Sequence, residues 1–355
     1  MSRRVRRVAA RLLPALALVL LAACAHSGAR VAAAAPSAGV DIGWPPPPDR
    51  ARVRFEKSFA VPRDLGIRKN WFRRVVSFVA GTSAFEEMAR PHGVASAADG
   101  LYAVADPDGP VLHLFDVREA RYVRVTVAGK VPFLAPVGAA IDAAGTVYVS
   151  DAVRRTVYRI DRQGKCLGTL GGPEEFERPT GLAYDAGRGL LFVVDTTGHR
   201  VRAYDAAGRR ALSFGTRGRG DGEFNYPVAI AVGPGGDLYV DDSMNHRVQV
   251  FAPDGSFRRR FGAPGNGPGA FDKSKGIGVD ADGHVYVADA MHDVVQVFDG
   301  AGRLLTVIGG SGDGPGEFSL PTGVFVDASG HILVADSANR RVQVLRYVGD
   351  AGEGS

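Results

Sequence analysis

Aspartate and arginine are the residues whose spacing in this chain first suggests chemistry. Six aspartates each end a short apolar run, and successive ones are separated by 45, 44, 47, 47 and 47 residues: Asp106, Asp151, Asp195, Asp242, Asp289 and Asp336. Three arginines follow in the adjoining turns, Arg200, Arg247 and Arg341. A carboxylate at a strand end can accept hydrogen bonds from turn N–H groups and pair with a nearby arginine. Because an active site needs unlike groups that converge, we predict that these repeated residues are structural.

Three glycine-rich segments, at 215–222, 262–269 and 309–316, superficially suggest phosphate cradles. None has the Lys-Ser or Lys-Thr pair that completes a P-loop. Each precedes an equivalent phenylalanine, and Phe224, Phe271 and Phe318 are 47 residues apart. We therefore predict connections between repeats. The carboxylates at 312–317 are too few to indicate a Ca²⁺ site.

Histidine is the remaining candidate for metal or acid–base chemistry. His199 and His246 fall in equivalent turns, His284 and His331 fall in equivalent hairpins, and neither pair is expected to converge with His92. A zinc site needs three or more protein ligands. There is no Gly-x-Ser-x-Gly elbow, and neither a serine nor Cys166 has a base beside it at the level of a motif. The sequence therefore predicts no catalytic residues, no metal and no cofactor.

These residues recur because the chain itself repeats from residue 90 onwards. Each copy opens with Pro-x-Gly or a variant, and an apolar strand, a tight turn and a second strand then lead to the aspartate. A third and a fourth strand follow. A period in the forties, made of short strands divided by Gly and Asp turns, is typical of a propeller blade. The sequence predicts an all-β fold, a six-bladed β-propeller.

A lone strand at 52–59 precedes the repeats, and the sixth repeat ends one strand short. We predict that this strand completes the last blade, so that no sheet edge stays open. The predicted propeller spans 51–349, with a closing strand at 51–60, a helical insertion at 61–89 and repeats at 90–349; a tail follows at 350–355. Within the insertion, residues 68–80 predict a basic amphipathic helix that packs on the ring or lies on a membrane surface.

Two turns carry a specific resemblance. Asp242-Ser243-Met244-Asn245-His246-Arg247-Val248 and Asp336-Ser337-Ala338-Asn339-Arg340-Arg341-Val342 resemble the NHL repeat, which implies six-bladed β-propellers. The resemblance covers residues 90–347, and the segments before it are similar to bacterial lipoproteins of this propeller class. Related propellers include a zinc-dependent amidating lyase whose histidines converge on the central channel. Here the channel-facing residues of Pro-x-Gly are His92, Val137, Thr180, Val228, Lys275 and Thr322, only one of them an imidazole.

The first 23 residues have the features of an export signal. A basic head with five arginines precedes a ten-residue apolar core, which is too short to span a bilayer. Leu21-Ala22-Ala23-Cys24 resembles the bacterial lipoprotein cleavage box, which implies lipidation of Cys24 and a tether at 24–50 with a proline-rich end. Ala25 resembles the outer-membrane sorting pattern. We expect an outer-membrane lipoprotein of the cell envelope that faces the periplasm or the exterior.

Charge adds a further limit on partners. The signal segment holds five of the 43 basic residues and none of the 38 acidic ones, so the mature chain is formally neutral. Balanced charge and export both disfavour nucleic acid. We predict a non-enzymatic, monomeric scaffold that binds a protein, a peptide or an envelope polysaccharide through His92, Thr180, Lys275 and Thr322 at the channel mouth. The alternative is a metal-dependent lyase or lactone hydrolase of the six-bladed propeller type.

Overall fold

The computed structural model describes residues 41–68 and 87–349. The signal segment, Cys24, the tail at 350–355 and all but the first residue of the predicted helix at 68–80 lie outside these ranges. The described residues contain no α-helix, only the short 3-10 helices η1 (Pro62–Leu65), η3 (Pro234–Gly236) and η4 (Ser243–Asn245). Within the same ranges, no helix has the length and apolar character needed to cross a bilayer.

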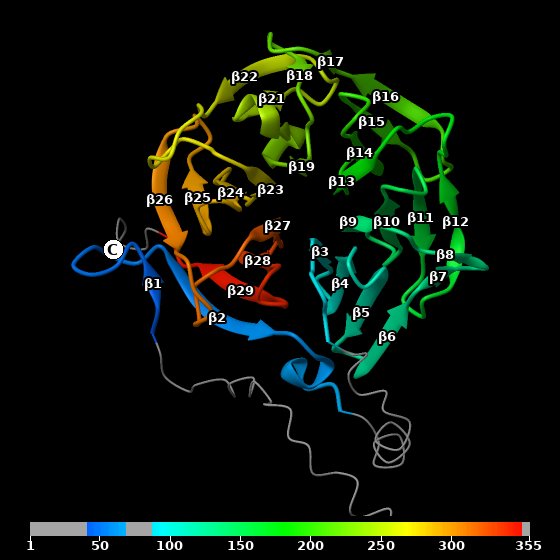
Figure 1. The fold of residues 1–355 in the computed structure, drawn as a ribbon, viewed down its shortest axis with the longest axis horizontal. Helices are drawn as coiled ribbons and strands as arrows, with labels where there is room; N and C mark the ends of the chain where they lie inside the picture. Colours follow the sequence, from blue (N-terminus) through cyan, green and yellow to red (C-terminus); the bar gives the residue numbers. More distant parts are fainter. Residues whose placement is uncertain (1–40, 69–86, 350–355) are drawn as a thin grey trace, which may run out of the picture. The chain divides into compact units, whose positions relative to one another are not determined.

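Six antiparallel sheets surround a central axis, which confirms the predicted propeller (Figure 1). From the axis outwards, the first sheet is β3 (Gly93–Ser96), β4 (Leu101–Asp106), β5 (Val111–Asp116) and β6 (Arg121–Val125). The second is β9 (Pro136–Ile141), β10 (Val147–Asp151), β11 (Thr156–Ile160) and β12 (Cys166–Leu170). The third is β13 (Pro179–Asp185), β14 (Leu190–Asp195), β15 (Arg200–Tyr204) and β16 (Arg210–Phe214).

The remaining three blades follow the same order. The fourth is β19 (Ala229–Val232), β20 (Leu238–Asp242), β21 (Arg247–Phe251) and β22 (Phe257–Phe261). The fifth is β23 (Ser274–Val279), β24 (Val285–Asp289), β25 (Val294–Phe298) and β26 (Leu304–Gly309). The sixth is β27 (Pro321–Val326), β28 (His331–Asp336), β29 (Arg341–Tyr347), β2 (Val53–Phe59) and β1 (Gly43–Trp44). Two minor pairs complete the strands: β7 (Val127–Ala128) with β8 (Val131–Pro132), and β17 (Thr216–Arg217) with β18 (Glu223–Phe224).

The hydrophobic core lies between neighbouring blades. Strands such as β21 and β24 are buried along their whole length because another blade covers each face. Phe224, Phe271 and Phe318 are fully buried at the ends of the glycine-rich segments. The ring of Phe271 packs against Phe298 with centroids 5.5 Å apart. Full burial of one such side chain stabilises the fold by about 1.5–3 kcal/mol, so these phenylalanines hold each connection in place.

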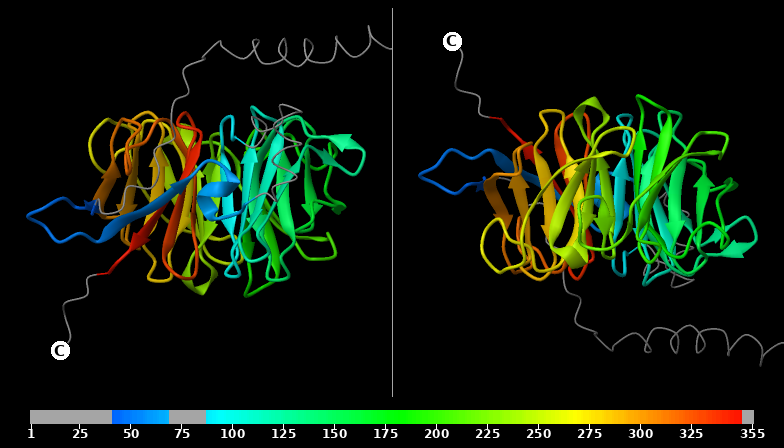
Figure 2. Two further views of the ribbon diagram at one scale, coloured as in Figure 1. Left: turned by 90° about the horizontal axis from the view of Figure 1, so that it is seen from below. Right: turned by 90° about the horizontal axis from the view of Figure 1, so that it is seen from above.

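Strand β2 closes the ring as the sequence predicts. It pairs antiparallel with β29, from Val53 opposite Tyr347 to Phe59 opposite Val342. In the side views, blue β2 lies along red β29 (Figure 2). The last blade therefore joins the two ends of the propeller sequence, and β29 has no open edge.

The predicted tether at 24–50 is wrong for its last part. Gly43 and Trp44 form β1, which pairs with β2 opposite Arg54 and Val53. Trp44 packs against the core cluster between the fifth and last blades, which includes Val53. The residues at 45–50 turn the chain between the two strands rather than extending it. The reason is that Trp44 gains apolar contacts on the blade edge that a solvated linker does not provide.

Candidate functional site

All six blade aspartates are buried where their second strand ends. Each accepts backbone N–H groups from the segment that enters its own blade. The amide of Asn225 donates to Asp242 at 2.7 Å, and the amide of Ser319 donates to Asp336 at 2.8 Å. A buried carboxylate that holds the segment leading into its blade positions that segment and is not free to react.

Two of the predicted arginines pair with these carboxylates. Arg247 Nε donates to Asp242 Oδ2 at 2.8 Å, and Arg341 Nε donates to Asp336 Oδ2 at 2.7 Å. Both guanidinium groups also bond to carbonyl oxygens of the preceding glycine-rich loops, including that of Gly220 at 2.8 Å. The pair therefore ties a loop to its blade.

In the third blade Arg202, and not Arg200, pairs with the blade aspartate. Arg202 Nη1 donates to Asp195 Oδ2 at 2.6 Å, whereas Arg200 Nε bonds to the carbonyl of Gly198 at 2.8 Å. Arg202 occupies the third position of β15, which faces the same side as the first. From that position a guanidinium reaches the carboxylate, and Arg200 is left to bond within its own turn.

Three buried glutamines hold the glycine-rich loops, and the sequence reasoning missed them. The side-chain oxygens of Gln249, Gln296 and Gln343 accept from the amides of Gly222, Gly269 and Gly316 at 3.0, 2.7 and 2.9 Å. Their NH₂ groups donate to loop carbonyls. The sequence pattern that could have identified these glutamines is a Val-Gln-Val triplet that recurs every 47 residues.

The glycine of Pro-x-Gly sets how closely the inner strands approach around the channel. A Cβ at Gly138 would overlap the carbonyl of Thr180, and a Cβ at Gly323 would overlap the carbonyl of His92. Gly323 instead donates its N–H to the His92 carbonyl at 2.9 Å. This bond joins the sixth blade to the first and fixes the channel wall.

Two hollows lie along the channel and share one apolar ring. This waist is formed by one side chain from each inner strand: Val94, Ala139, Leu182, Ile230, Ile277 and Val324. On one side is a hollow of about 50 Å³, which we name the narrow recess. On the other is a cavity of about 680 Å³ walled mainly by small apolar residues, which we name the wide cavity.

The narrow recess contains only two of the four predicted contact residues. His92 and Lys275 line it, together with Val137 and Val228. Thr180 and Thr322 are buried, and the expectation that they face a partner is wrong. The hydroxyl of Thr180 lies 2.7 Å from that of Thr196, and the hydroxyl of Thr322 lies 2.8 Å from that of Ser337. These bonds turn both side chains into the wall.

The charge state of the recess follows from burial. Burial first, and then repulsion by Lys275, lower the pKa of His92 to about 4, so the imidazole is neutral near pH 7. Burial and repulsion by Lys273 lower the pKa of Lys275, while Asp241 raises it. Asp241 is fully buried, and Ser274 Oγ donates to it at 2.5 Å. The sequence reasoning overlooked Asp241, although the residue before the blade aspartate is Ala, Ser or Val in every other copy.

Asp241 makes stability depend on pH. Its pKa is raised from the ordinary 3.8 to about 7, chiefly by burial, with smaller increases from Asp242 and Asp289 and opposing effects of Ser274 and Lys275. The folded state therefore holds this proton more tightly. Its stabilising contribution is complete below about pH 4 and is lost as pH rises through about 7. We expect Asp241→Asn to raise the free energy of unfolding at pH 8 by about 2–4 kcal/mol, and to change it far less at pH 4.5.

Urea unfolding of both proteins at the two pH values measures this difference. An equal gain at pH 4.5 and pH 8 would contradict the assignment, because packing alone does not depend on pH.

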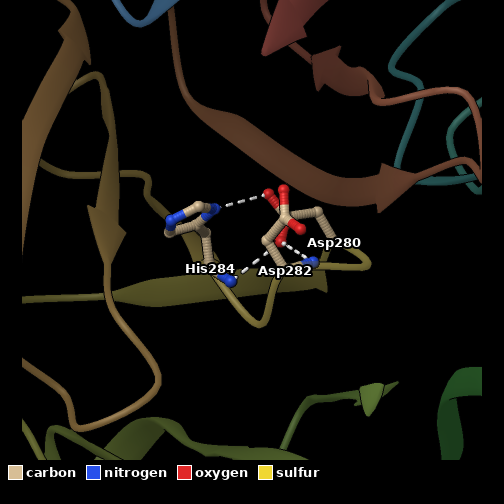
Figure 3. A group of neighbouring side chains, drawn as sticks. All are labelled: Asp280, Asp282 and His284. Carbon is tan, nitrogen blue, oxygen red and sulfur yellow. Dashed lines mark hydrogen bonds and ion pairs between the residues drawn. The ribbon is translucent and has the colours of Figure 1, made fainter. Parts of the chain in front are cut away.

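A separate group of possible metal ligands lies on the hairpin between β23 and β24. Ligand atoms of Asp280, Asp282 and His284 lie within 4.8 Å of one another (Figure 3). His284 Nδ1 is 2.9 Å from Asp280 Oδ2. The equivalent hairpin of the sixth blade pairs His331 with Asp327 at the same 2.9 Å. A pairing that recurs in two hairpins fits a turn-stabilising role, and none of the three residues lines the narrow recess.

Comparison with known proteins agrees with this architecture. A family model described as a 6-bladed beta-propeller matches residues 279–350, and a model of the NHL repeat matches residues 224–251. The chain is thus a six-bladed β-propeller that carries the NHL repeat. No curated protein matches it.

Solved structures show the same fold at low sequence identity. A streptogramin B lyase is 13% identical with a TM-score of 0.56, covering 73% of this chain and 94% of that one. A gluconolactonase from Xanthomonas campestris is 17% identical with a TM-score of 0.56, covering 73% and 86%. Nidogen, from its complex with laminin, is 16% identical with a TM-score of 0.51, covering 62% and 80%. At these identities the likeness shows the fold alone.

Proposed function

We propose that this protein is an exported envelope lipoprotein that binds a protein, peptide or polysaccharide partner at the narrow recess without catalysing a reaction. The observation that carries the proposal is Lys275. Its half-buried side chain lines the recess, yet it makes no hydrogen bond or ion pair with any residue that the structure describes. A partly desolvated ammonium with no carboxylate of the described residues at ion-pair distance is unfavourable, and a bound partner that supplies one would relieve this.

The other lining residues support binding over catalysis. Apart from His92 and Lys275 they are glycines and aliphatic residues, so the lining residues that the structure describes present no carboxylate, hydroxyl or thiol. Hydrolysis or acyl transfer needs a nucleophile or a pair of unlike acid and base groups around the reacting bond. The recess has the groups to hold a ligand, but these walls do not supply such a set.

Crosslinking in intact cells, followed by identification of the attached molecule, tests the proposal. The double variant His92→Ala with Lys275→Glu is expected to lose at least roughly nine-tenths of the captured partner, because a desolvated charge of the wrong sign opposes it. Lys130→Glu is the matched control, since Lys130 is an exposed lysine on the hairpin between β7 and β8. Equal capture by all three proteins would place the binding face elsewhere.

The alternative is a metal-dependent lyase or lactone hydrolase. It is favoured by the fold shared with a streptogramin B lyase and a gluconolactonase. Metal content of the purified protein separates the two functions. Stoichiometric zinc or calcium, with an activity that chelation abolishes, would support the enzyme over the binding protein.

A further inference from the structure

We infer that the narrow recess captures the free C-terminal carboxylate of a peptide, with Lys275 as its cation and His92 as acceptor for the N–H of the last residue. The inference deepens the proposed function and rests on it. It depends on the size of the recess, on the charges that converge there and on the two side chains that line it.

Size limits what can enter. The recess is about 50 Å³ and its walls include the apolar waist, so it has room for one small group and not for the body of a ligand. A carboxylate at the end of a chain meets this limit, because the rest of the chain can remain outside the ring. A carboxylate in the middle of a polymer could enter only if the polymer backbone, which would lie across the mouth of the recess, bent inwards.

Charge selects an anion. Lys273 and Arg178 are exposed, and like Lys275 neither makes a side-chain hydrogen bond or ion pair with another described residue. Both repel Lys275, and Arg90 and Arg178 repel a protonated His92. Cations from the first, third and fifth blades thus act on one small hollow. Each of these cations attracts an anion that is placed in the recess. The attraction to Lys275 is the strongest, because its ammonium is partly desolvated.

The acids near the mouth do not reverse this preference. Asp241 attracts Lys275, but it is fully buried, bonds to Ser274 and does not line the recess. Glu177 and Asp272 are exposed and directly precede Arg178 and Lys273, so they weaken the field at the rim. Neither is among the charges that chiefly shift the pKa of Lys275.

His92 adds a second contact and favours a peptide end over a bare oxyanion. A hydrogen bond to the Val137 backbone raises the pKa of His92 against the larger effect of burial, which keeps the ring neutral. A neutral imidazole has one N–H and one acceptor nitrogen. With its N–H directed to a backbone carbonyl, His92 presents the acceptor. The last residue of a peptide carries an N–H next to its carboxylate, and capture of chain termini is a recurring mode of peptide recognition.

The experiment titrates purified full-length protein with acetyl-Ala-Ala, its C-terminal amide, acetate, galacturonate and inorganic phosphate, and follows binding by NMR. The free-acid peptide is expected to bind at least tenfold tighter than its amide and tighter than acetate. Lys275→Met is expected to weaken it at least tenfold, Lys275→Arg less than threefold, and Lys130→Met not at all. Equal binding of acid and amide, tighter binding of phosphate or galacturonate, or an unchanged affinity in Lys275→Met would each overturn the inference.

Failure of the inference and failure of the proposed function give different results. If cellular capture depends on Lys275 but the acid and amide peptides bind alike, a partner binds here by another group and only the inference falls. If the acid peptide binds selectively while capture in cells is unaffected by the recess variants, the carboxylate site stands and the proposed cellular role falls. Unfolding curves for Lys275→Met and Lys275→Arg check that both variants fold, which is expected because the Lys275 side chain makes no hydrogen bond or ion pair with any described residue.

Discussion

A chain that begins at residue 61 is expected to unfold roughly 10 °C or more below a chain that begins at residue 41. Removal of β1 and β2 exposes β29 as a sheet edge and uncovers the core of the last blade. Val53 and Phe59 are almost fully buried, and Trp44 packs against the same blade. At about 1.5–3 kcal/mol for each such side chain, the loss is comparable with the whole stability of many domains.

Two single variants separate lost packing from the mere shortening of the chain. Phe59→Ala in the chain from residue 41 is expected to lower the free energy of unfolding by about 3–5 kcal/mol. Lys57→Ala is the matched control, because Lys57 is exposed on the same strand, and it is expected to change the value by less than about 0.5 kcal/mol. Calorimetry and light scattering measure stability and edge-to-edge aggregation. A chain from residue 61 that melts at the same temperature and stays monomeric would refute the role of the closing strand.

The propeller ring and its closing strand could be predicted because the same weak sequence pattern occurs in all six repeats. One Asp or one Pro-x-Gly says little, but six copies at nearly constant spacing fix the blade boundaries. The lone strand at 52–59 was then the only strand without a blade, and the sixth repeat was the only blade without an outer strand. The same logic separated the structural aspartates from catalytic ones, since every copy has one.

Details that differ between copies could not be predicted in this way. Trp44 joins the last blade through a two-residue strand, which leaves no periodic pattern in the sequence. Arg202 replaces Arg200 because side-chain reach, not position in the turn, decides which guanidinium meets Asp195. Thr180 and Lys275 occupy equivalent positions, yet the threonine bonds into the wall while the lysine lines the recess. A short hydroxyl side chain can reach a neighbouring blade, whereas a long charged one extends into the recess and is only half-buried.

The wide cavity could not be predicted from the sequence either. Its walls come from the last residues of the first strand of each blade and from the hairpins that follow, where the sequence offers mostly alanine, valine and isoleucine. Taken singly, each of these residues is typical of an ordinary strand or turn and does not indicate a cavity. Only the closed ring brings their small side chains around one space, and the width of that space depends on how closely the glycines of Pro-x-Gly let the inner strands approach.

Asp242→Ala is expected to lower the free energy of unfolding by about 3–5 kcal/mol. Asp242 accepts from Arg247 Nε at 2.8 Å, from Asn245 Nδ2 at 2.8 Å and from Gln249 Nε2 at 3.1 Å, and it is fully buried. Its loss leaves the guanidinium of Arg247, which is only 6% exposed, as an uncompensated buried charge. Urea unfolding at pH 7 measures the effect.

The control is an ion pair of the same kind on the surface. Asp221 and Arg260 lie 2.8 Å apart with side chains about half exposed, so Asp221→Ala is expected to change the free energy of unfolding by less than about 1 kcal/mol. The double variant Asp242→Ala with Arg247→Met is expected to recover part of the loss, because it removes the stranded charge as well as its partner. If the double variant is as unstable as the sum of the two single variants, the aspartate acts through its backbone bonds to the blade entry and not through the arginine. In that case Asp242 would hold only the segment that enters its blade, and Arg247 would hold only the glycine-rich loop.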